Sequence, residues 1–251
     1  MGYAANWRTE CTSGEKTVTE AEWLACTDPA PMLAFLDEKG SHRSYRLFSC
    51  ACVRRWWHLL TDERYCKAIE TTEDYLDGKV TEARQRKAHK TANAILSTLS
   101  LPYPPIDICA LEATGPPVKE SGASWVAARY TADGIVHALW EAGGRKRKKN
   151  TEAERRIQAD ILRDIFGNPF LPITISPAVL AWNDNVVVRL AQAAYDKRHL
   201  PEGTLDNARL AVLADALEEA GCSDADILMH CRSGGEHVRG CWVVDLLLGK
   251  E

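Results

Sequence analysis

The chain has 251 residues, of which 45% are hydrophobic and 26% charged, and 35 acidic against 31 basic side chains give a formal net charge of −4. This length suffices to bury a core without disulfide or metal support. The near balance of charge excludes a general electrostatic attraction to nucleic acid or membrane. The longest apolar stretch, Trp242 to Leu248, contains Asp245 and is far shorter than the roughly 20 residues of a membrane-spanning helix.

The ends of the chain and its cysteines indicate a compartment. The first residues, Met1 to Lys16, include Glu10 and Glu15 and lack the apolar segment of a secretory signal. The nine cysteines are an odd number and do not have the spacing of a compact disulfide framework. We therefore expect a cytoplasmic protein in which most cysteines are reduced and which has no membrane partner.

Ordered structure is predicted to begin at Thr19. Residues 1–18 are polar and without apolar periodicity, and they are predicted to form a flexible N-terminal arm. Thr19, with Glu22 three residues later, is a capping-box pattern that starts a helix, and Asp28-Pro29 ends that helix. Apolar spacing and capping residues predict four further helices, over residues 31–38, 41–59, 61–78 and 81–99.

The middle of the chain carries the clearest breaks. Leu101 to Pro117 holds five prolines and is predicted to be a surface connection without an element. A helix is expected over 121–142, with Gly134 as a weak point, and Gly143-Gly144 ends it. The five consecutive bases Arg145, Lys146, Arg147, Lys148 and Lys149 then indicate an exposed, mobile loop.

The last hundred residues also have helical patterns. A helix capped by Thr151 is expected to end at Gly167, followed by an extended, proline-bounded segment over 168–177. In Trp182-Asn183-Asp184-Asn185 polar residues interrupt the next helix, which is typical of a cap or turn. The remaining helices are expected over 178–198, 205–220, 223–231 and 237–248.

Together these elements predict an all-α protein, an irregular multi-helix bundle of about ten helices. No pair of segments has a convincing strand pattern, and no fixed-period repeat is visible. The predicted organisation is a flexible arm (1–18), an N-terminal helical half (19–142), a basic loop (143–150) and a C-terminal helical half (151–251). The two halves could equally form one continuous domain.

Three stretches of the sequence carry a resemblance to a known family. They are Thr19-Glu-Ala-Glu-Trp-Leu-Ala-Cys-Thr-Asp-Pro29, Leu162-Arg-Asp-Ile-Phe-Gly-Asn-Pro-Phe170, and Ala214 to Glu251 with its closing His237-Val-Arg-Gly-Cys-Trp-Val-Val-Asp-Leu-Leu-Leu-Gly-Lys-Glu251. They resemble an uncharacterised family of paralogous planctomycete proteins, and the likeness covers most of residues 19–251. Residues 101–149 depart from the family pattern. The resemblance implies an origin and assigns no activity.

The C-terminal region holds the strongest candidate for chemistry. Five side chains of the type that zinc accepts lie within about twenty residues. On a predicted helix over 237–248, His237 and Cys241 would share one face, while His230 and Cys231 would close the preceding helix. The candidate zinc ligands are Cys222, His230, Cys231, His237 and Cys241.

Two other interpretations of this cluster remain open. Free cysteines are commonly buried in cores, and a histidine is favoured at a helix C-terminus by the helix dipole, so packing alone would explain the residues. Alternatively, Cys231 beside His237 would form a thiol–imidazole pair across Gly234-Gly235. The sequence contains no GxSxG, Walker-type loop, GxGxxG or HExxH. Enzyme classes with these local signatures are therefore not indicated.

A second group of cysteines is better explained by packing. Cys50 and Cys52 point about 200° apart on a helix, so they are poorly placed to share a metal ion with His58 or Cys66. The predicted apolar stripe makes Cys52 a core residue. Acidic residues over 206–226 are explained in the same way, as helix caps and solvated faces.

Clustered bases give a third hypothesis, weak nucleic-acid binding through Arg145 to Lys149, because neutralising phosphates requires grouped Lys and Arg. No nucleic-acid-binding motif accompanies the run.

The function we expect first is a protein-interaction or regulatory module, with Trp7, Trp57, Trp140 or Trp182 as an exposed aromatic anchor. A metal- or thiol-dependent enzyme centred on the C-terminal cluster is the alternative.

Overall fold

A computed structural model describes residues 18–98, 103–115, 123–142 and 144–250. Within these ranges the chain forms twelve α-helices and no strand, so the predicted all-α class is confirmed. None of the helices described is long and apolar enough to cross a membrane. Apart from Val18, the predicted N-terminal arm lies outside the described residues, as does Trp7.

Side-chain caps start the first three helices, at Thr19 and Ser41 as the sequence predicts and at Asp28, which begins the second helix two residues earlier than predicted. The Thr19 hydroxyl accepts the N–H of Glu22, and the Glu22 carboxylate accepts the N–H of Thr19, which completes the capping box. Asp28 and Ser41 cap the next two helices. The three helices are α1 (Glu20–Ala25), α2 (Pro29–Leu36) and α3 (His42–Arg54).

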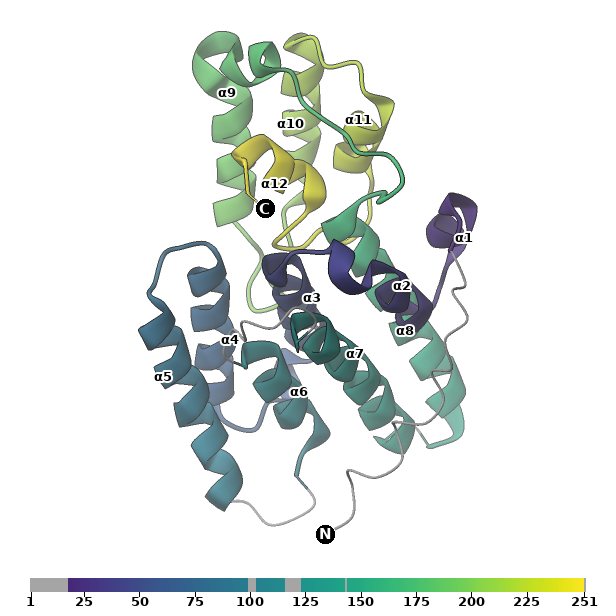
Figure 1. Cartoon of the computed structure of the whole chain (residues 1–251), viewed down its shortest axis with the longest axis vertical. Helices are drawn as coiled ribbons and strands as arrows, with labels where there is room; N and C mark the ends of the chain where they lie inside the picture. Colours follow the sequence, from purple (N-terminus) through teal and green to yellow (C-terminus); the bar gives the residue numbers. More distant parts are fainter. Residues whose placement is uncertain (1–17, 99–102, 116–122, 143, 251) are drawn as a thin grey trace.

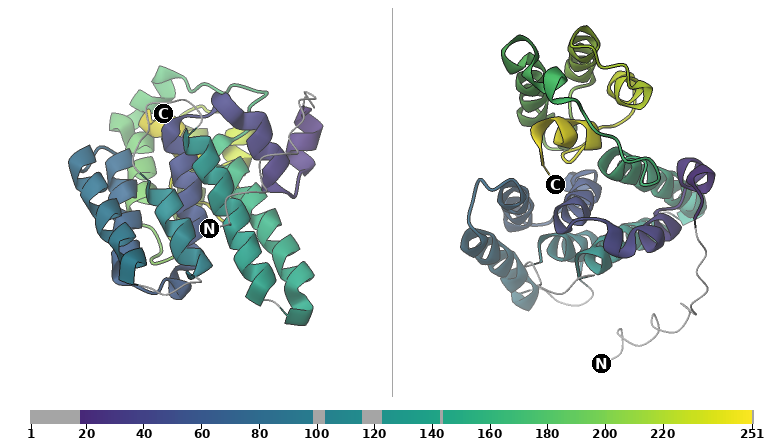
Figure 2. Two further views of the ribbon diagram at one scale, coloured as in Figure 1. Left: turned by 60° about the horizontal axis from the view of Figure 1, so that its bottom comes forward. Right: turned by 45° about the horizontal axis from the view of Figure 1, so that its top comes forward.

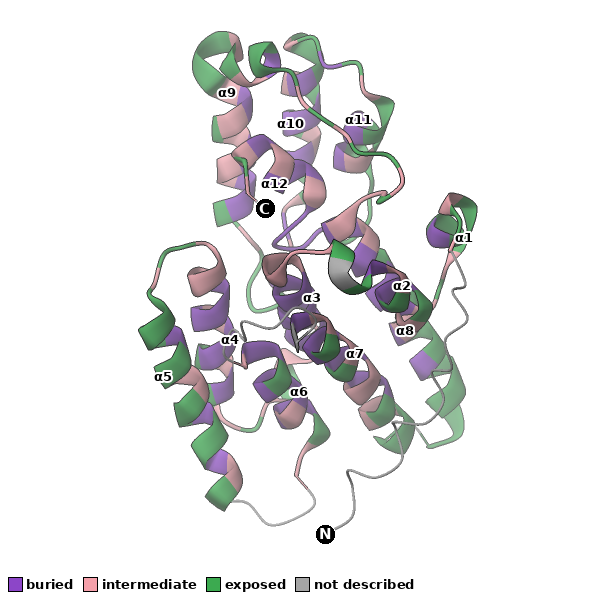
Figure 3. Cartoon of the chain, in the orientation of Figure 1, coloured by how far each residue is buried: buried purple, intermediate pink, exposed green. Residues whose placement is uncertain are grey.

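Helix α3 lies at the centre of the lower lobe in Figure 1, and Figure 3 shows it largely buried. It packs against α6, α7 and α8. It is shorter than predicted, because the chain leaves the α conformation at Trp56 and forms a 3-10 helix over Trp57–Leu59. Helices α4 (Glu63–Leu76) and α5 (Glu82–Asn93) follow, capped by Asp62 and Thr81.

The predicted proline-rich connection is wrong where the structure describes it, because residues Pro105–Thr114 form helix α6. Prolines occur in the sequence before and after this helix, and Pro105 occupies its first turn. A backbone N–H in the first turn has no partner within the helix, so a proline costs nothing there. Helix α7 (Ala123–Ala142) packs closely on α6. A Cβ on Gly134 would lie 2.7 Å from the Cys109 sulfur, so this glycine permits the close approach of the two helices.

The predicted basic loop is also wrong, because the run is helical. Gly144–Lys146 form a 3-10 turn, and α8 (Arg147–Phe166) begins inside the run. Lys and Arg are good helix formers, and Lys148 lies 3.9 Å from Glu152 one turn later. The five basic side chains are nevertheless exposed, as predicted.

The C-terminal helices form the upper lobe of Figure 1, which the views of Figure 2 show from two further directions. They are α9 (Pro177–Asp196), α10 (Asn207–Glu219), α11 (Ala225–Arg232) and α12 (Trp242–Leu248). Helix α9 is kinked at Asn183, Asp184 and Asn185, which adopt left-handed backbone angles that Asn and Asp tolerate best. The helix predicted from His237 begins only at Trp242.

Two buried apolar clusters divide the described residues. The first contains side chains of α1 to α8 together with Val238, and the second contains side chains of α9 to α12. Because α8 belongs to the first cluster, the boundary between the two clusters lies after Phe166, and the division into two helical halves stays a prediction.

A network of buried charges joins the two clusters. Glu73 on α4 and Asp77 at the C-cap of α4, one turn apart, have side chains that are 2% and 0% exposed. Arg54 pairs with Glu73 through two hydrogen bonds of 2.6 and 2.9 Å, and Arg239 contacts both carboxylates. The remaining partners are Arg198 on Glu73, and Arg43, Lys250 and the Tyr195 hydroxyl on Asp77.

These partners keep the two carboxylates ionised. Burial acts to raise the pKa of Glu73, but the hydrogen bonds and charge of Arg54, with the charges of Arg198 and Arg239, outweigh it and lower that pKa. The pKa of Asp77 is lowered for the same reason, with Arg239 opposing the effect of burial most strongly. The network is therefore fully charged at neutral pH.

Replacing Arg239 with methionine should destabilise the fold strongly. The side chain of Arg239 is 5% exposed, and its loss leaves buried carboxylates undercompensated, which typically costs about 3–5 kcal/mol. Urea denaturation followed by circular dichroism measures the change in unfolding free energy. The control is Arg232→Met, which removes ion pairs to Asp215 and Glu218 at the surface and should change little. Equal stability of the two variants would contradict a structural role for the network.

Stability should also fall in acid. The lowered pKa values of Glu73 and Asp77 give a contribution that is complete above the unfolded-state values of about 4.3 and 3.9, and it is lost as the pH falls below about 5 through the folded-state values. Urea midpoints measured between pH 7 and pH 3 test this. The decline should be shallower in Arg239→Met, because Asp77 then titrates closer to its ordinary range. An equally steep decline in both proteins would exclude Arg239 as its source.

Candidate metal centre

Four side chains with metal-binding donor atoms converge where the two clusters meet. They come from α8 (Asp164), the last turn of α11 (His230), the loop that follows it (His237) and the N-cap of α12 (Cys241). One donor atom of each lies within 4.8 Å of the others. Asp164, His237 and Cys241 are buried, whereas the His230 side chain is 18% exposed.

Backbone pairing holds the loop that carries His237. The carbonyl of His237 accepts the N–H of Leu205 at 2.8 Å, and Val238 forms an isolated β-bridge with Thr204. Gly240 then turns the chain at a φ of +96°, and a Cβ there would lie 2.9 Å from Leu47 Cδ1. The positive φ favours a glycine at this position.

Asp164 is the centre of the cluster. Its Oδ2 accepts the N–H of Val238 at 2.8 Å, and its Oδ1 lies 2.6 Å from His237 Nδ1 and 3.1 Å from His230 Nε2. Burial acts to raise the pKa of Asp164, but hydrogen bonds from the two histidines and their charges outweigh it and lower that pKa. Asp164 is therefore an ionised carboxylate inside the protein.

The neighbours of Asp164 respond to its charge. Burial acts to lower the pKa of His237, but the hydrogen bond and charge of Asp164 raise it above the ordinary histidine value. Burial, together with the charge of Asp164, raises the pKa of the Cys241 thiol well above its usual range. The Cys241 sulfur lies 3.2 Å from His230 Nε2 and is a protonated thiol at neutral pH in the absence of a metal.

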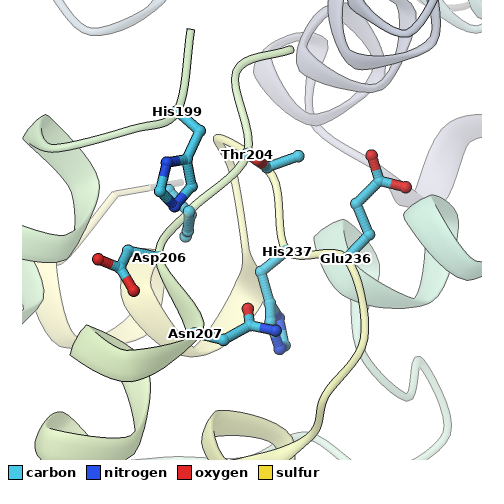
Figure 4. A pocket seen from close by; sticks show the side chains of 7 residues that line it. His199, Thr204, Asp206, Asn207, Glu236 and His237 are labelled. Atoms are coloured by element: carbon cyan, nitrogen blue, oxygen red, sulfur yellow. The ribbon is translucent and has the colours of Figure 1, made fainter.

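Two surface pockets flank the cluster. One of about 330 Å³ includes His199, Asp206, Asn207, Glu236 and His237 in its lining, and we call it the His199 pocket. In Figure 4 the side chains of Glu236 and His237 leave the loop in opposite directions, and His237 lies beside Asn207.

The second pocket, of about 340 Å³, reaches the cluster from the side of α8. Asp164, His230 and Ser233 line it together with Arg163, Asp160 and Glu236, and we call it the Arg163 pocket. Asp164 and His230 therefore place the cluster at the wall of the Arg163 pocket.

The structure unites three of the five ligands proposed from sequence, His230, His237 and Cys241. Cys222 and Cys231 lie in the second apolar cluster and are not part of the group of four. The expected helical face of His237 and Cys241 is wrong, because both precede α12 and are brought together by the turn at Gly240. Burial and the charge of Asp164 raise the pKa of Cys231 to about 12, the opposite of what a nucleophilic thiol requires.

Sequence reasoning missed Asp164 and Ser233. Asp164 falls on the apolar stripe of its helix, with Ile157 and Ile161 one or two turns earlier. An acidic residue in an apolar stripe is costly to bury unless it is paired, and that was the available signal. Ser233 directly follows α11 as its C-cap, and no local motif marks it.

The other predicted site residues lie elsewhere. Cys50 and Cys52 are both fully buried, which confirms Cys52 as a core residue. Two arginines outside the run over 145–149 are paired with acidic residues: Arg54 is buried against Glu73, and Arg55 contacts Glu154 and Glu236. The basic residues of α5 lie at the opposite side of the lower lobe from the start of α8 in Figures 1 and 2. Nucleic-acid binding through Arg145 to Lys149 stays a prediction.

The predicted aromatic anchors differ in exposure. Trp140 is 43% exposed and has Arg147 over its ring, whereas Trp57 and Trp182 are half-buried. Val126 and Tyr130, at 37% and 54% exposure, fall on the same face of α7 as Trp140. A protein-interaction role stays a prediction, and this face of α7 is where a test would start.

Comparison of the chain with models of known protein families, with characterised proteins and with solved structures finds no match. Functional inference for this chain therefore rests on the chemistry of its own residues.

Proposed function

We propose that the protein binds a divalent transition metal ion, with Zn²⁺ the best match, at the cluster of Asp164, His230, His237 and Cys241. The observation that supports this most directly is the convergence of an oxygen donor from α8 with two nitrogen donors and one sulfur donor from residues 230–241. Zinc prefers this mixed set, whereas Mg²⁺ and Ca²⁺ prefer oxygen ligands.

The size of the cluster agrees with this proposal. Metal–ligand lengths of about 2.0–2.3 Å place the donor atoms of a tetrahedral site about 3.3–3.8 Å apart. The contacts of Asp164 Oδ1 with His237 Nδ1 and His230 Nε2, at 2.6 and 3.1 Å, are somewhat shorter, because protons now occupy the space between these atoms. An entering ion displaces the proton of the Cys241 thiol. The positive charge of the ion then balances the negative charge of Asp164, which the histidine hydrogen bonds balance in its absence. Small side-chain movements provide the remaining space.

Zinc binding should depend on Cys241 and not on Cys231. We expect wild-type protein to bind one Zn²⁺ ion in competition with a chromophoric chelator. Loss of a residue that only hydrogen-bonds to a metal ligand typically lowers metal affinity about 10–100-fold, and Cys241→Ala, which removes a ligand itself, should lower it further. Cys231→Ala is the matched control, because this thiol is equally buried but outside the group of four. Zinc at 1,000 times its dissociation constant should also stabilise the fold by about 4.1 kcal/mol.

Failure of metal-free wild-type protein to bind a stoichiometric ion would overturn the metal proposal. Equal affinities in the two cysteine variants would do the same. Circular dichroism of each variant distinguishes loss of the ligand from loss of the fold.

A second candidate function comes from the alignment of Ser233 with the same residues. Its hydroxyl lies 2.9 Å from His237 Nε2, and His237 Nδ1 lies 2.6 Å from Asp164 Oδ1, the order of contacts in a Ser-His-Asp hydrolase triad. Ser233 is exposed and lines the Arg163 pocket. In this function His237 accepts the serine proton while the serine oxygen attacks a carbonyl or phosphoryl centre.

The two candidate functions exclude each other at His237. A metal on Nδ1 leaves the proton on Nε2, which then donates to Ser233 and can no longer accept the serine proton. In the metal-free protein, Nδ1–H donates to Asp164 and Nε2 is available as a base. One ring therefore serves one function at a time.

A fluorophosphonate probe tests the triad. In metal-free protein, the Ser233 oxygen should bond to phosphorus as fluoride leaves and the serine proton passes to His237, which intact-mass and peptide mass spectrometry detect. Labelling should be absent in Ser233→Ala and suppressed by zinc, whereas Ser176→Ala, at another exposed cap, should leave it unchanged. No labelling of metal-free wild-type protein would exclude the triad and leave the metal proposal intact.

A further inference from the structure

His230 differs from the other three members of the cluster in what its second ring nitrogen contacts. The indole N–H of Trp242 donates to His230 Nδ1 at 3.2 Å. An indole nitrogen can only donate, so His230 Nδ1 carries a lone pair, and the neutral ring has its proton on Nε2. That Nε2–H points at two acceptors, Asp164 Oδ1 at 3.1 Å and Cys241 Sγ at 3.2 Å.

Neither ring reorientation nor movement of the tryptophan easily changes this arrangement. Turning the His230 ring by 180° would place carbon atoms at both contacts and lose every hydrogen bond. The Trp242 ring rests on Gly167, where a Cβ would lie 3.1 Å from its Cγ. The surrounding packing therefore favours a His230 that donates from Nε2.

A metal ligand needs the opposite arrangement. A neutral histidine that binds a metal through Nε2 carries its proton on Nδ1 and usually donates it to a carboxylate or carbonyl oxygen. At Nδ1 of His230 it would meet another donor, the Trp242 N–H. His237 has no such conflict, because its Nε2 contacts the Ser233 hydroxyl, which can accept as well as donate.

We infer that the metal of the proposed function is held by three residues, Asp164, His237 and Cys241, and that its fourth position is open to water or a small monovalent anion, to which His230 donates. This inference rests on the proposed metal site. Asp164 and His230 line the Arg163 pocket, through which the exogenous ligand would enter. A Zn²⁺ ion with one carboxylate and one thiolate is neutral overall, which suits either fourth ligand.

Three protein ligands and one exchangeable position are the arrangement of catalytic zinc sites, whereas structural sites use four protein ligands. A bound metal lowers the pKa of a coordinated water, and a neighbouring N–H stabilises the resulting hydroxide or an anion in its place. His230 would therefore orient the exogenous ligand and would not hold the ion itself.

Cobalt substitution with azide as the probe separates an open site from a closed one. The visible spectrum of Co²⁺ reports its ligands, and azide should shift it saturably in wild-type protein. His230→Phe should still bind one Co²⁺ ion within about 10-fold of wild-type affinity, but bind azide about 10-fold or more weakly because a hydrogen bond to a charged ligand is lost. His199→Phe, in the neighbouring pocket, should leave both affinities unchanged.

Trp242→Phe provides a second variant with the opposite expectation. Without the indole N–H, His230 Nδ1 can take the proton and Nε2 can bind the metal, so Co²⁺ affinity should rise and the azide response should disappear. Wild-type protein that binds Co²⁺ without any azide response, or loss of Co²⁺ binding by more than about 100-fold in folded His230→Phe, overturns the open site and leaves a closed four-ligand site. Absence of Co²⁺ and Zn²⁺ binding in wild-type protein overturns the proposed function itself.

Discussion

The buried charge of Asp164 is the constraint on which the arrangement of the two apolar clusters depends. An ionised carboxylate inside a protein must be compensated by charges or hydrogen bonds, because the cost of removing it from water is large. This carboxylate contacts three residues of the C-terminal part of the chain, His230, His237 and, through its backbone N–H, Val238. Asp164 belongs to α8 of the first cluster, so satisfying it requires the loop after α11 to lie against α8. One carboxylate thus fixes both the position of the loop and the geometry of the candidate metal centre.

Residues 237–239 make further contacts between the C-terminal part of the chain and the elements of the first apolar cluster. His237 contacts Asp164, the side chain of Val238 packs in the first apolar cluster, and Arg239 contacts Glu73 on α4 and Asp77 at its C-cap. Buried ion pairs contribute little net stability, because desolvation offsets their attraction, but an unpaired member is costly. The network therefore acts mainly against alternative packings, since few other positions of residues 237–239 would satisfy both Asp164 and the α4 carboxylates. The candidate metal centre gains a rigid frame from interactions that lie outside it.

Local signals in the sequence predict the helices well and the site only partly. The Thr19 capping box, the Ser41 cap and the apolar periodicity of α3 depend on near neighbours, so they can be read without tertiary structure. The proline content of residues 101–117 predicts a connection where the structure has helix α6, because the prolines lie at the ends of this segment and not in the interior of the helix. His230, His237 and Cys241 were found because they are close in sequence, whereas Asp164 is separated from His237 by a loop and three further helices. Its place on an apolar stripe shows that it must be paired but does not identify the partner.

The positions of the protons on the ring nitrogens of His230 and His237 decide whether each histidine acts as a metal ligand, a base or a hydrogen-bond donor. The distances between heavy atoms alone do not decide this. His237 has Asp164 on one nitrogen and Ser233 on the other, and each partner tolerates either tautomer: the carboxylate accepts a proton or shares a metal, and the hydroxyl donates or accepts. His230 lacks this freedom, because Trp242 offers it only a donor. The adaptable ring therefore suits the role of ligand or base, and the constrained ring suits the role of donor. The rings of His230 and His237 are in edge-to-face contact, with their centroids 4.7 Å apart. The indole N–H of Trp242 contacts only one of them, and this difference suits the two rings to different roles.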